Sequence, residues 1–224
     1  MSIAIIPARS GSTRIKNKNI RAFHGKPILA YSIETAIRTG LFDRIIVSTN
    51  SEDIADVALE YGACPVWRGD TMSQNDIGTQ QVVQFVIKQL DVKSNFVCCL
   101  YATAPLMKSF DISDGLKVLV EDEKANYAFS VGTEPLQDAG QFYWGRRTAF
   151  ETGLSLIGPR SRMIPIESER VCDINTEDDW LRAERMYADL HNNETEIRAG
   201  GVTWVGNIYT EPKECPSILS KIKL

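Results

Sequence analysis

Residues 3–131 of this chain alternate between short apolar runs and segments in which apolar residues recur at helical spacing. The runs lie at 3–7, 44–49, 64–67, 96–101 and 127–131, and the helical patterns at 27–40, 51–62, 78–90 and 111–120. A continuous apolar run is typical of a strand buried on both faces of a parallel sheet. Strands joined by helices form right-handed βαβ units. The sequence therefore predicts a Rossmann-like, doubly wound α/β fold with a mostly parallel sheet.

The alternation stops over residues 132–166. This stretch contains two aromatic-rich pieces, QFYWG (141–145) and RTAFE (147–151), between glycines and prolines. We interpret it as an inserted β-hairpin or arm that projects from the sheet. A helix is predicted again over 176–190, where Thr176 and Asp179 resemble a capping box. A single domain is expected over 1–190. The tail, 191–224, has no clear period; a hairpin near 202–209 is one interpretation, and its role is unassigned.

Composition excludes several classes of protein. The 25 basic and 29 acidic residues give a net charge of −4, and the basic residues are scattered, which disfavours nucleic-acid binding. Five cysteines without a CxxC motif argue against a disulfide framework or a zinc site. No apolar stretch approaches the ~20 residues that span a membrane, and the N-terminus lacks the features of a signal peptide. We expect a cytoplasmic protein with no membrane partner.

The loop at 8–19, after the first predicted strand, is the strongest candidate for a ligand site. It carries Arg9, Arg14, Lys16 and Lys18 together with three hydroxyl side chains. In open parallel sheets, ligands bind beyond the carboxyl ends of the strands, and cations with backbone N–H groups hold phosphates there. Gly11 is its one glycine, so neither GxGxxG nor the P-loop pattern is present. The loop is therefore a candidate polyphosphate site, and a solvated basic loop without a ligand is the alternative.

Several ordered motifs carry a family resemblance. IIPARSGSTRIKNKNI and GKPILAYSIE, followed by FDRIIVSTNSEDIA, LYATAP and DINTEDDW, resemble CMP-sugar synthetases that activate sialic acid-like sugars. Within that family, DAGQFYWG (138–145) is similar to pseudaminic acid cytidylyltransferases. The resemblance implies transfer of CMP from CTP to the anomeric hydroxyl of a nine-carbon keto acid, with Mg²⁺ and release of pyrophosphate. It also implies a nucleotide-diphospho-sugar transferase fold and a homodimer in which the β-rich arm reaches the neighbour's site.

The same resemblance assigns site residues by motif. It implies that Arg9, Lys18 and Asp173 are catalytic, and that Asp173 and Asn175 hold the metal. The nucleotide would be bound by Ala8, Arg9, Ser10, Ser12, Lys18, Asn19, Arg68, Asp76, Thr79 and Thr103. Of these, Arg68, Asp76 and Thr79 would frame the cytosine. The sugar would meet Thr103, Ala104, Gly140, Gln141 and Tyr143.

Some positions depart from the family pattern. Asn175 stands where a second acid is usual, and Asn50 stands where an aspartate usually follows Ser-Thr. An amide oxygen can bind Mg²⁺ but adds no charge, so a weaker or single-metal site is expected. Thr13 replaces a basic residue, and Arg14 stands where glycine is common and would restore the charge. Two alternatives stay open: a synthetase for legionaminic or N-acetylneuraminic acid, or a catalytically weak homologue that binds nucleotide or sugar.

Overall fold

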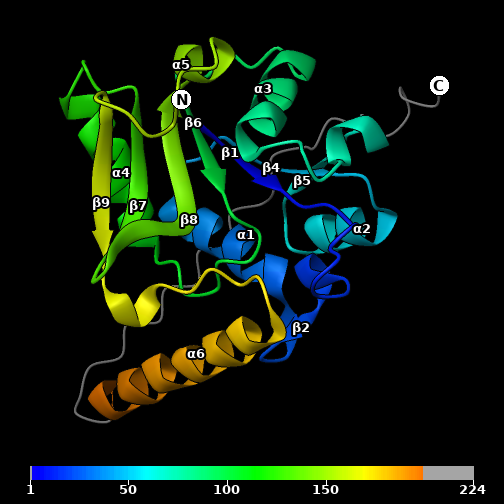
Figure 1. The fold of residues 1–224 in the computed structure, drawn as a ribbon, viewed down its shortest axis with the longest axis vertical. Coiled ribbons are helices and arrows are strands. Elements are labelled where there is room, and N and C mark those ends of the chain that lie inside the picture. The colour runs from blue at the N-terminus through cyan, green and yellow to red at the C-terminus, as the bar shows by residue number, and fades with distance from the viewer. Residues whose placement is uncertain (1, 199–224) are drawn as a thin grey trace.

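The computed structural model describes residues 2–198, with side chains described for residues 2–192. Its centre is a seven-stranded sheet in the order β5-β4-β1-β6-β8-β7-β9 (Figure 1). The strands are β1 (Ser2–Pro7), β4 (Arg44–Thr49), β5 (Cys64–Trp67), β6 (Phe96–Leu100), β7 (Tyr127–Thr133), β8 (Leu136–Arg146) and β9 (Ser161–Ile166). Neighbouring strands are parallel except that β8 is antiparallel to both β6 and β7. The predicted α/β fold with a mostly parallel sheet is confirmed.

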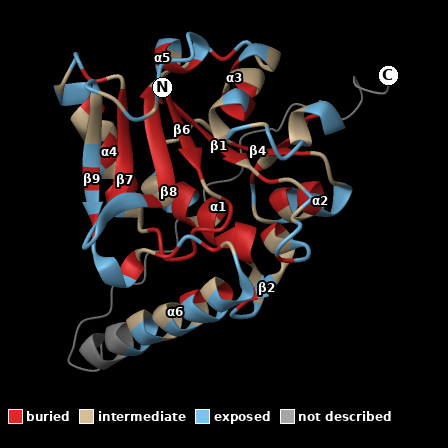
Figure 2. Cartoon of the chain, viewed as in Figure 1, coloured by how far each residue is buried: buried red, intermediate tan, exposed pale blue. Residues whose placement is uncertain are grey.

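Helices cover both faces of this sheet. On one face, α1 (Ile28–Thr39), α2 (Glu52–Glu60) and α4 (Ser109–Glu121) pack in a core that includes Ile6, Leu29 and Ile112. On the other face, α3 (Thr79–Gln89) and α5 (Arg147–Glu151) pack around Ile5 and Val86. Figure 2 shows the central strands buried between these layers. The continuous apolar runs of the sequence are explained by this double coverage.

The segment at 132–166 differs from the predicted projecting arm. Its first aromatic piece belongs to β8, which pairs with β6 over Phe142–Arg146 and also with β7, and its second piece, RTAFE, is helix α5. Trp144 is fully buried, and its indole N–H donates to the carbonyl of Ile112 at 2.7 Å. This packing depends on Gly115, because a Cβ there would lie 2.6 Å from the Trp144 ring. The predicted β-hairpin is present as β7 and β8, but both of its strands belong to the central sheet, because tertiary packing and not a local pattern sets the place of β8.

The last described element is α6 (Glu177–Arg198), which extends beyond the predicted end of the domain at residue 190. Asp179 caps its start by accepting hydrogen bonds from the backbone of Thr176 and from the Thr176 hydroxyl. Trp180 packs against Phe23 of a small hairpin formed by β2 (Ala22–Phe23) and β3 (Lys26–Pro27). The hairpin considered near 202–209 lies outside the described residues.

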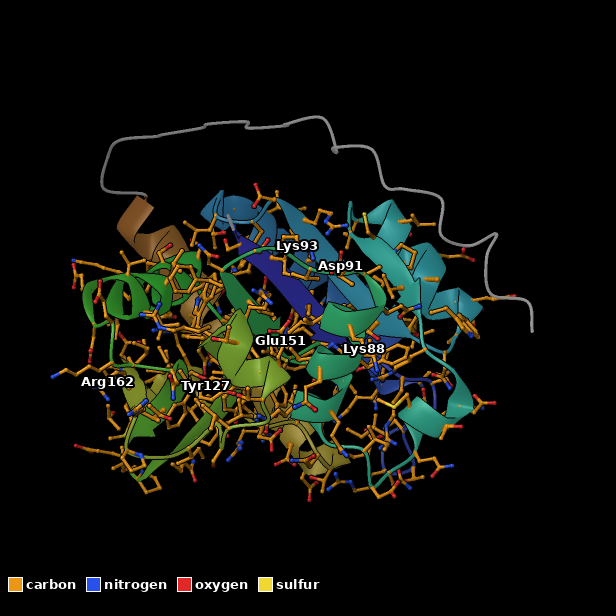
Figure 3. All side chains as sticks on the ribbon, turned by 90° about the horizontal axis from the view of Figure 1, so that it is seen from above. Lys88, Asp91, Lys93, Tyr127, Glu151 and Arg162 are labelled. Atoms are coloured by element: carbon orange, nitrogen blue, oxygen red, sulfur yellow. The ribbon has the colours of Figure 1, made fainter. Side chains whose placement is uncertain are left out.

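Loops leave the sheet along two edges, one at the carboxyl ends of the parallel strands (the carboxyl edge) and one at their amino ends. Six strands end at the edge that faces α6 (Figure 1). At the opposite edge, Figure 3 labels Asp91 and Lys93 in the loop before β6 and Arg162 at the start of β9. Within the described part of the chain, no helix combines the length and apolarity needed to cross a membrane. The candidate loop at 8–19 emerges at the carboxyl edge, as its position after β1 predicts.

Candidate active site

A cleft of about 510 Å³ opens at the carboxyl edge of the sheet, beside the ends of β1 and β6. These two strands are neighbours, but the chain continues from β1 toward β4 and β5 and from β6 toward β8 and β7. The cleft therefore lies at the topological switch point, where ligands of open α/β sheets bind. The cationic loop, the segment after β5 and the segment after β6 form its walls.

The described charged side chains that line this cleft are all cationic. Arg9, Arg14, Lys18 and Arg68 line it, and the described lining residues include no aspartate or glutamate. Lys16, also predicted in the basic loop, is exposed and lies outside the lining. Burial lowers the pKa of Lys18, and nearby Arg14 and Arg9 lower it further, against an opposing effect of Asp173. A bound polyanion would relieve this repulsion among cations.

Arg68 is the most deeply buried of these cations. It is 3% exposed, and its Nε has no hydrogen-bond partner among the described residues. Burial, followed by repulsion from Arg9, lowers the pKa of Arg68 to about 10. A buried cation without a carboxylate partner is costly unless a ligand or hydrogen bonds compensate. Its position after β5 is therefore suited to an acceptor group on a bound ligand.

Hydrogen bonds to distant segments fix the shape of the loop at 8–19. The Asn50 side-chain oxygen accepts the backbone N–H of Ser10 at 3.1 Å. The Asn19 amide donates to the carbonyl of Arg9 at 2.9 Å, and the Arg9 guanidinium donates to the carbonyl of Ser73 at 3.0 Å. Asn50, one of the departures from the family pattern, thus anchors the loop to the end of β4 and does not line the cleft.

The segment that contains Asp173 and Asn175 is held from both sides. Lys18 donates to the carbonyl of Ile174 at 2.7 Å, and Asp179 accepts the backbone N–H of Asn175 at 3.0 Å. The Asn175 amide nitrogen donates to Asp173 at 2.5 Å, while its oxygen accepts from Arg14 at 2.9 Å. The Asn175 oxygen is therefore already used, and Asp173 is the carboxylate available here.

A second cavity of about 460 Å³ adjoins this segment. It is formed by the end of β7, the start of β8, η3 (Ser168–Arg170) and α6, and Asp138, Asp173 and Arg182 line it. The Asp138 carboxylate accepts the Tyr143 hydroxyl and, at 2.9 Å, the backbone N–H of Gly140. Burial raises the pKa of Asp138 and the nearby Asp173 charge raises it further, against an opposing effect of the hydrogen bond from Gly140.

The structure brings many of the predicted site residues together. The cleft is lined by Arg9, Ser12, Lys18, Asn19, Arg68, Thr79, Thr103 and Asn175, and the second cavity by Asp173. Several other predicted residues line neither: Ala8, Ser10, Asp76, Ala104, Gly140, Gln141 and Tyr143. Asp76 is exposed, whereas Gln141 is buried and donates to the carbonyl of Arg170 at 2.6 Å. Gly140 lies against Asp173, because a Cβ there would be 3.7 Å from the carboxyl carbon.

Sequence reasoning did not single out three residues of this region. Tyr101 lines the cleft just beyond β6, and burial raises its pKa to about 12. Asp138 and Arg182 line the second cavity. Tyr101 and Asp138 lie within the motifs LYATAP and DAGQFYWG, and for Tyr101 its position at the end of the predicted strand was an additional signal. Arg182 lies on a helix face, where an exposed arginine carries no signal of its own.

Comparisons with known proteins agree with this geometry. A family model described as cytidylyltransferase matches residues 3–142. The pseudaminic acid cytidylyltransferase of Campylobacter jejuni strain 81-176 is 34% identical, over 86% of this chain and 98% of that protein. The CMP-N,N'-diacetyllegionaminic acid synthase of Legionella pneumophila is 37% identical over 52% of each chain.

Among solved structures, CMP:2-keto-3-deoxy-manno-octonic acid synthetase in complex with CTP matches with a TM-score of 0.70. The match covers 84% of this chain and 99% of that one at 14% identity, so it bears on the fold alone. The family model and the long match to the Campylobacter protein bear on the family itself. These two matches show that the chain belongs to the cytidylyltransferase family.

Proposed function

We propose that this enzyme transfers CMP from CTP to the anomeric hydroxyl of pseudaminic acid and releases pyrophosphate. One observation carries the proposal: a cleft at the switch point is lined by Arg9, Arg14, Lys18 and Arg68 and by no described carboxylate. A triphosphate carries the negative charge that would balance these cations. The acceptor is inferred from the relative named pseudaminic acid cytidylyltransferase. The match covers 98% of that protein and 86% of this chain.

The proposed roles follow from the charge that the reaction develops. The sugar hydroxyl oxygen bonds to the α-phosphorus while the bond to the bridging oxygen of pyrophosphate breaks, and the hydroxyl proton is released. Negative charge grows on the phosphoryl oxygens and on the leaving group. We assign Arg9, Arg14 and Lys18, which line the cleft, to bind those oxygens. We assign the Arg68 guanidinium, which lines the cleft, as a hydrogen-bond donor to the base.

A divalent metal ion, Mg²⁺ in our proposal, fits Asp173 but not Asn175. Mg²⁺ prefers hard oxygen ligands and is commonly held by one or two carboxylates with waters and phosphates. Asp173 offers such a carboxylate at the border of the two cavities, whereas the Asn175 oxygen accepts from Arg14. When bound, the ion would supply positive charge for the α-phosphate and the ionised acceptor hydroxyl. The role of Asn175 is then to orient Asp173 through its amide N–H.

Pyrophosphate release tests the proposal. Purified protein with CTP and Mg²⁺ should release pyrophosphate with pseudaminic acid and release less with legionaminic or N-acetylneuraminic acid. ATP and GTP in place of CTP serve as nucleotide controls. A preference for another nine-carbon acid would contradict the choice of acceptor while leaving the cytidylyl transfer intact.

A second candidate, a homologue that binds nucleotide with little turnover, is favoured by the amide at position 175. Tight CTP binding in a calorimeter, together with no release of pyrophosphate from any of the acids, would support it. Homodimer formation and a cytoplasmic location stay predictions of the sequence, and sedimentation of the purified protein would test the former.

A further inference from the structure

The second cavity has an uneven charge distribution. Glu134, Asp138 and Asp173 contribute carboxylates, and Arg182 is the one cation among its described lining residues. Its volume of about 460 Å³ is within the range of small-molecule sites. A negatively charged ligand can therefore enter in one favourable orientation, with its anionic group at Arg182 and its neutral groups toward the acids.

This cavity shares a wall with the nucleotide cleft. Asp173 lines the cavity, while Asn175, hydrogen-bonded to it at 2.5 Å, lines the cleft. Farther along the same border, Tyr101 of the cleft lies with its ring centre 5.8 Å from that of Tyr143, whose hydroxyl donates to Asp138. A ligand in each cavity would thus meet the other across Asp173.

We infer that the second cavity binds the acceptor and that Arg182 binds the carboxylate of the sugar acid. The inference rests on the proposed function. In a 2-keto acid closed to its ring form, the carboxylate and the anomeric hydroxyl are attached to adjacent carbons. A guanidinium that makes a bidentate hydrogen-bonded pair with the carboxylate therefore also fixes the position of the anomeric hydroxyl. With Arg182 and Asp173 on the same cavity, that hydroxyl is directed toward the cleft.

Arg182 is available for this role. Its side chain is 54% exposed, its contact with Asp179 is long, at 3.8 Å, and its remaining interaction is with the Cys172 side chain, which is no carboxylate. The other Asp179 oxygen accepts the backbone N–H groups of Asn175 and Thr176, just before α6, so this carboxylate has its own structural task. Arg170, which also lies beside the cavity, contrasts with it, because Arg170 is buried and paired with both Asp111 and Glu167.

The acidic side of the cavity indicates which substituents the rest of the acceptor has. Both oxygens of Asp138 already accept protein hydrogen bonds, which fixes the carboxylate in place. Glu134 stands nearby on the turn between β7 and β8. Carboxylates accept hydrogen bonds and repel anions, so neutral substituents with N–H or O–H groups, such as acylamino groups, are favoured at this end.

Steady-state kinetics of Arg182→Gln test the inference, with Arg185→Gln as the matched control. Arg185 is an exposed arginine on the same helix that lines neither cavity. We expect the KM for the acceptor to rise about 10- to 100-fold in Arg182→Gln, as for loss of a charge-assisted hydrogen bond. The KM for CTP and the melting temperature should stay at the wild-type values. Arg182→Lys should restore part of the affinity, and Arg185→Gln should behave as wild type.

A substrate change sharpens the test. The methyl ester of the acceptor lacks the anionic carboxylate, so wild type should use it poorly and Arg182→Gln should not distinguish ester from acid. An unchanged acceptor KM in Arg182→Gln, with an active wild type, would overturn the inference and leave the proposed function standing. If wild type turns over none of the acids, the proposed function fails. NMR detection of acid binding then decides: binding by wild type that is lost in Arg182→Gln supports the inference, and equal or no binding overturns it.

Discussion

Arg14 and Asn175 are 161 positions apart in the chain, yet the Arg14 guanidinium donates to the Asn175 side-chain oxygen at 2.9 Å. Both residues are departures from the family pattern, and the structure places them in contact. The Asn175 amide then donates to Asp173, so the contact orders the proposed metal-binding carboxylate. An aspartate at 175 would hold Arg14 in an ion pair and face Asp173 with a like charge.

Asn175→Asp should therefore make the protein dependent on divalent metal for stability. The substitution replaces a hydrogen bond to Asp173 by carboxylate repulsion, a loss of about 1 kcal/mol of unfolding free energy without metal. Added Mg²⁺ should recover it, because the ion would screen the two carboxylates. Thermal melting with and without Mg²⁺ measures this. An equal loss under both conditions would argue against a metal at Asp173.

Lys18→Ala should reduce activity at least about 100-fold, because this cation lines the cleft and also holds the carbonyl of Ile174. Lys16→Ala is its matched control, since Lys16 belongs to the same loop and is exposed outside the cleft. Rates of pyrophosphate release, together with CTP titrations, compare the two variants. Comparable activity in the two variants would contradict a role for Lys18 in binding phosphate.

Affinity for CTP should fall at alkaline pH. Burial lowers the pKa of Lys18 below its ordinary 10.5 in the free protein, and a bound triphosphate would raise it again. Because the complex then holds the proton more tightly than the free protein does, CTP binding takes up protons as the pH approaches the lowered pKa. Calorimetry above about pH 8, where phosphates are fully ionised, in buffers of different ionisation enthalpy measures this uptake. Proton release by wild type, or a proton uptake that stays unchanged in Lys18→Ala, would contradict the assignment.

Gly145→Ala should destabilise the fold by about 1–3 kcal/mol through overpacking. A Cβ at 145 would lie 2.5 Å from the Phe150 ring and 2.6 Å from the Tyr127 ring. Gly158→Ala serves as the control, since a Cβ there meets no atom within 4 Å. Chemical denaturation of both variants gives the comparison. Equal unfolding midpoints would show that β8 does not need the close approach seen at Gly145.

The parts of the fold predicted from sequence are those with a strong local signal. The buried run at 3–7 and the helical pattern that follows Pro27 fall on β1 and α1. Strand β8 has a weaker signal, because polar residues such as Gln141 interrupt it. Its place depends on Gly115 and Gly145, which make room for rings from other elements. No local pattern reports such a tertiary fit.

The candidate site divides in the same way. The loop at 8–19 is recognisable because Arg9, Arg14 and Lys18 are neighbours in sequence as well as in the cleft. The second cavity joins residues from β8 and α6 that are distant in the chain, so the sequence gives no sign that Asp138 and Arg182 line one space. Contacts of this kind depend on how the helices and strands pack.

The most direct test of the central claim is a crystal structure of the protein with CTP and Mg²⁺. The predicted result is a triphosphate bound among Arg9, Arg14 and Lys18, with the α-phosphate on the side of Asp173 and the base toward Arg68. CTP bound away from this cleft, or with its triphosphate outside the cationic loop, would contradict the account.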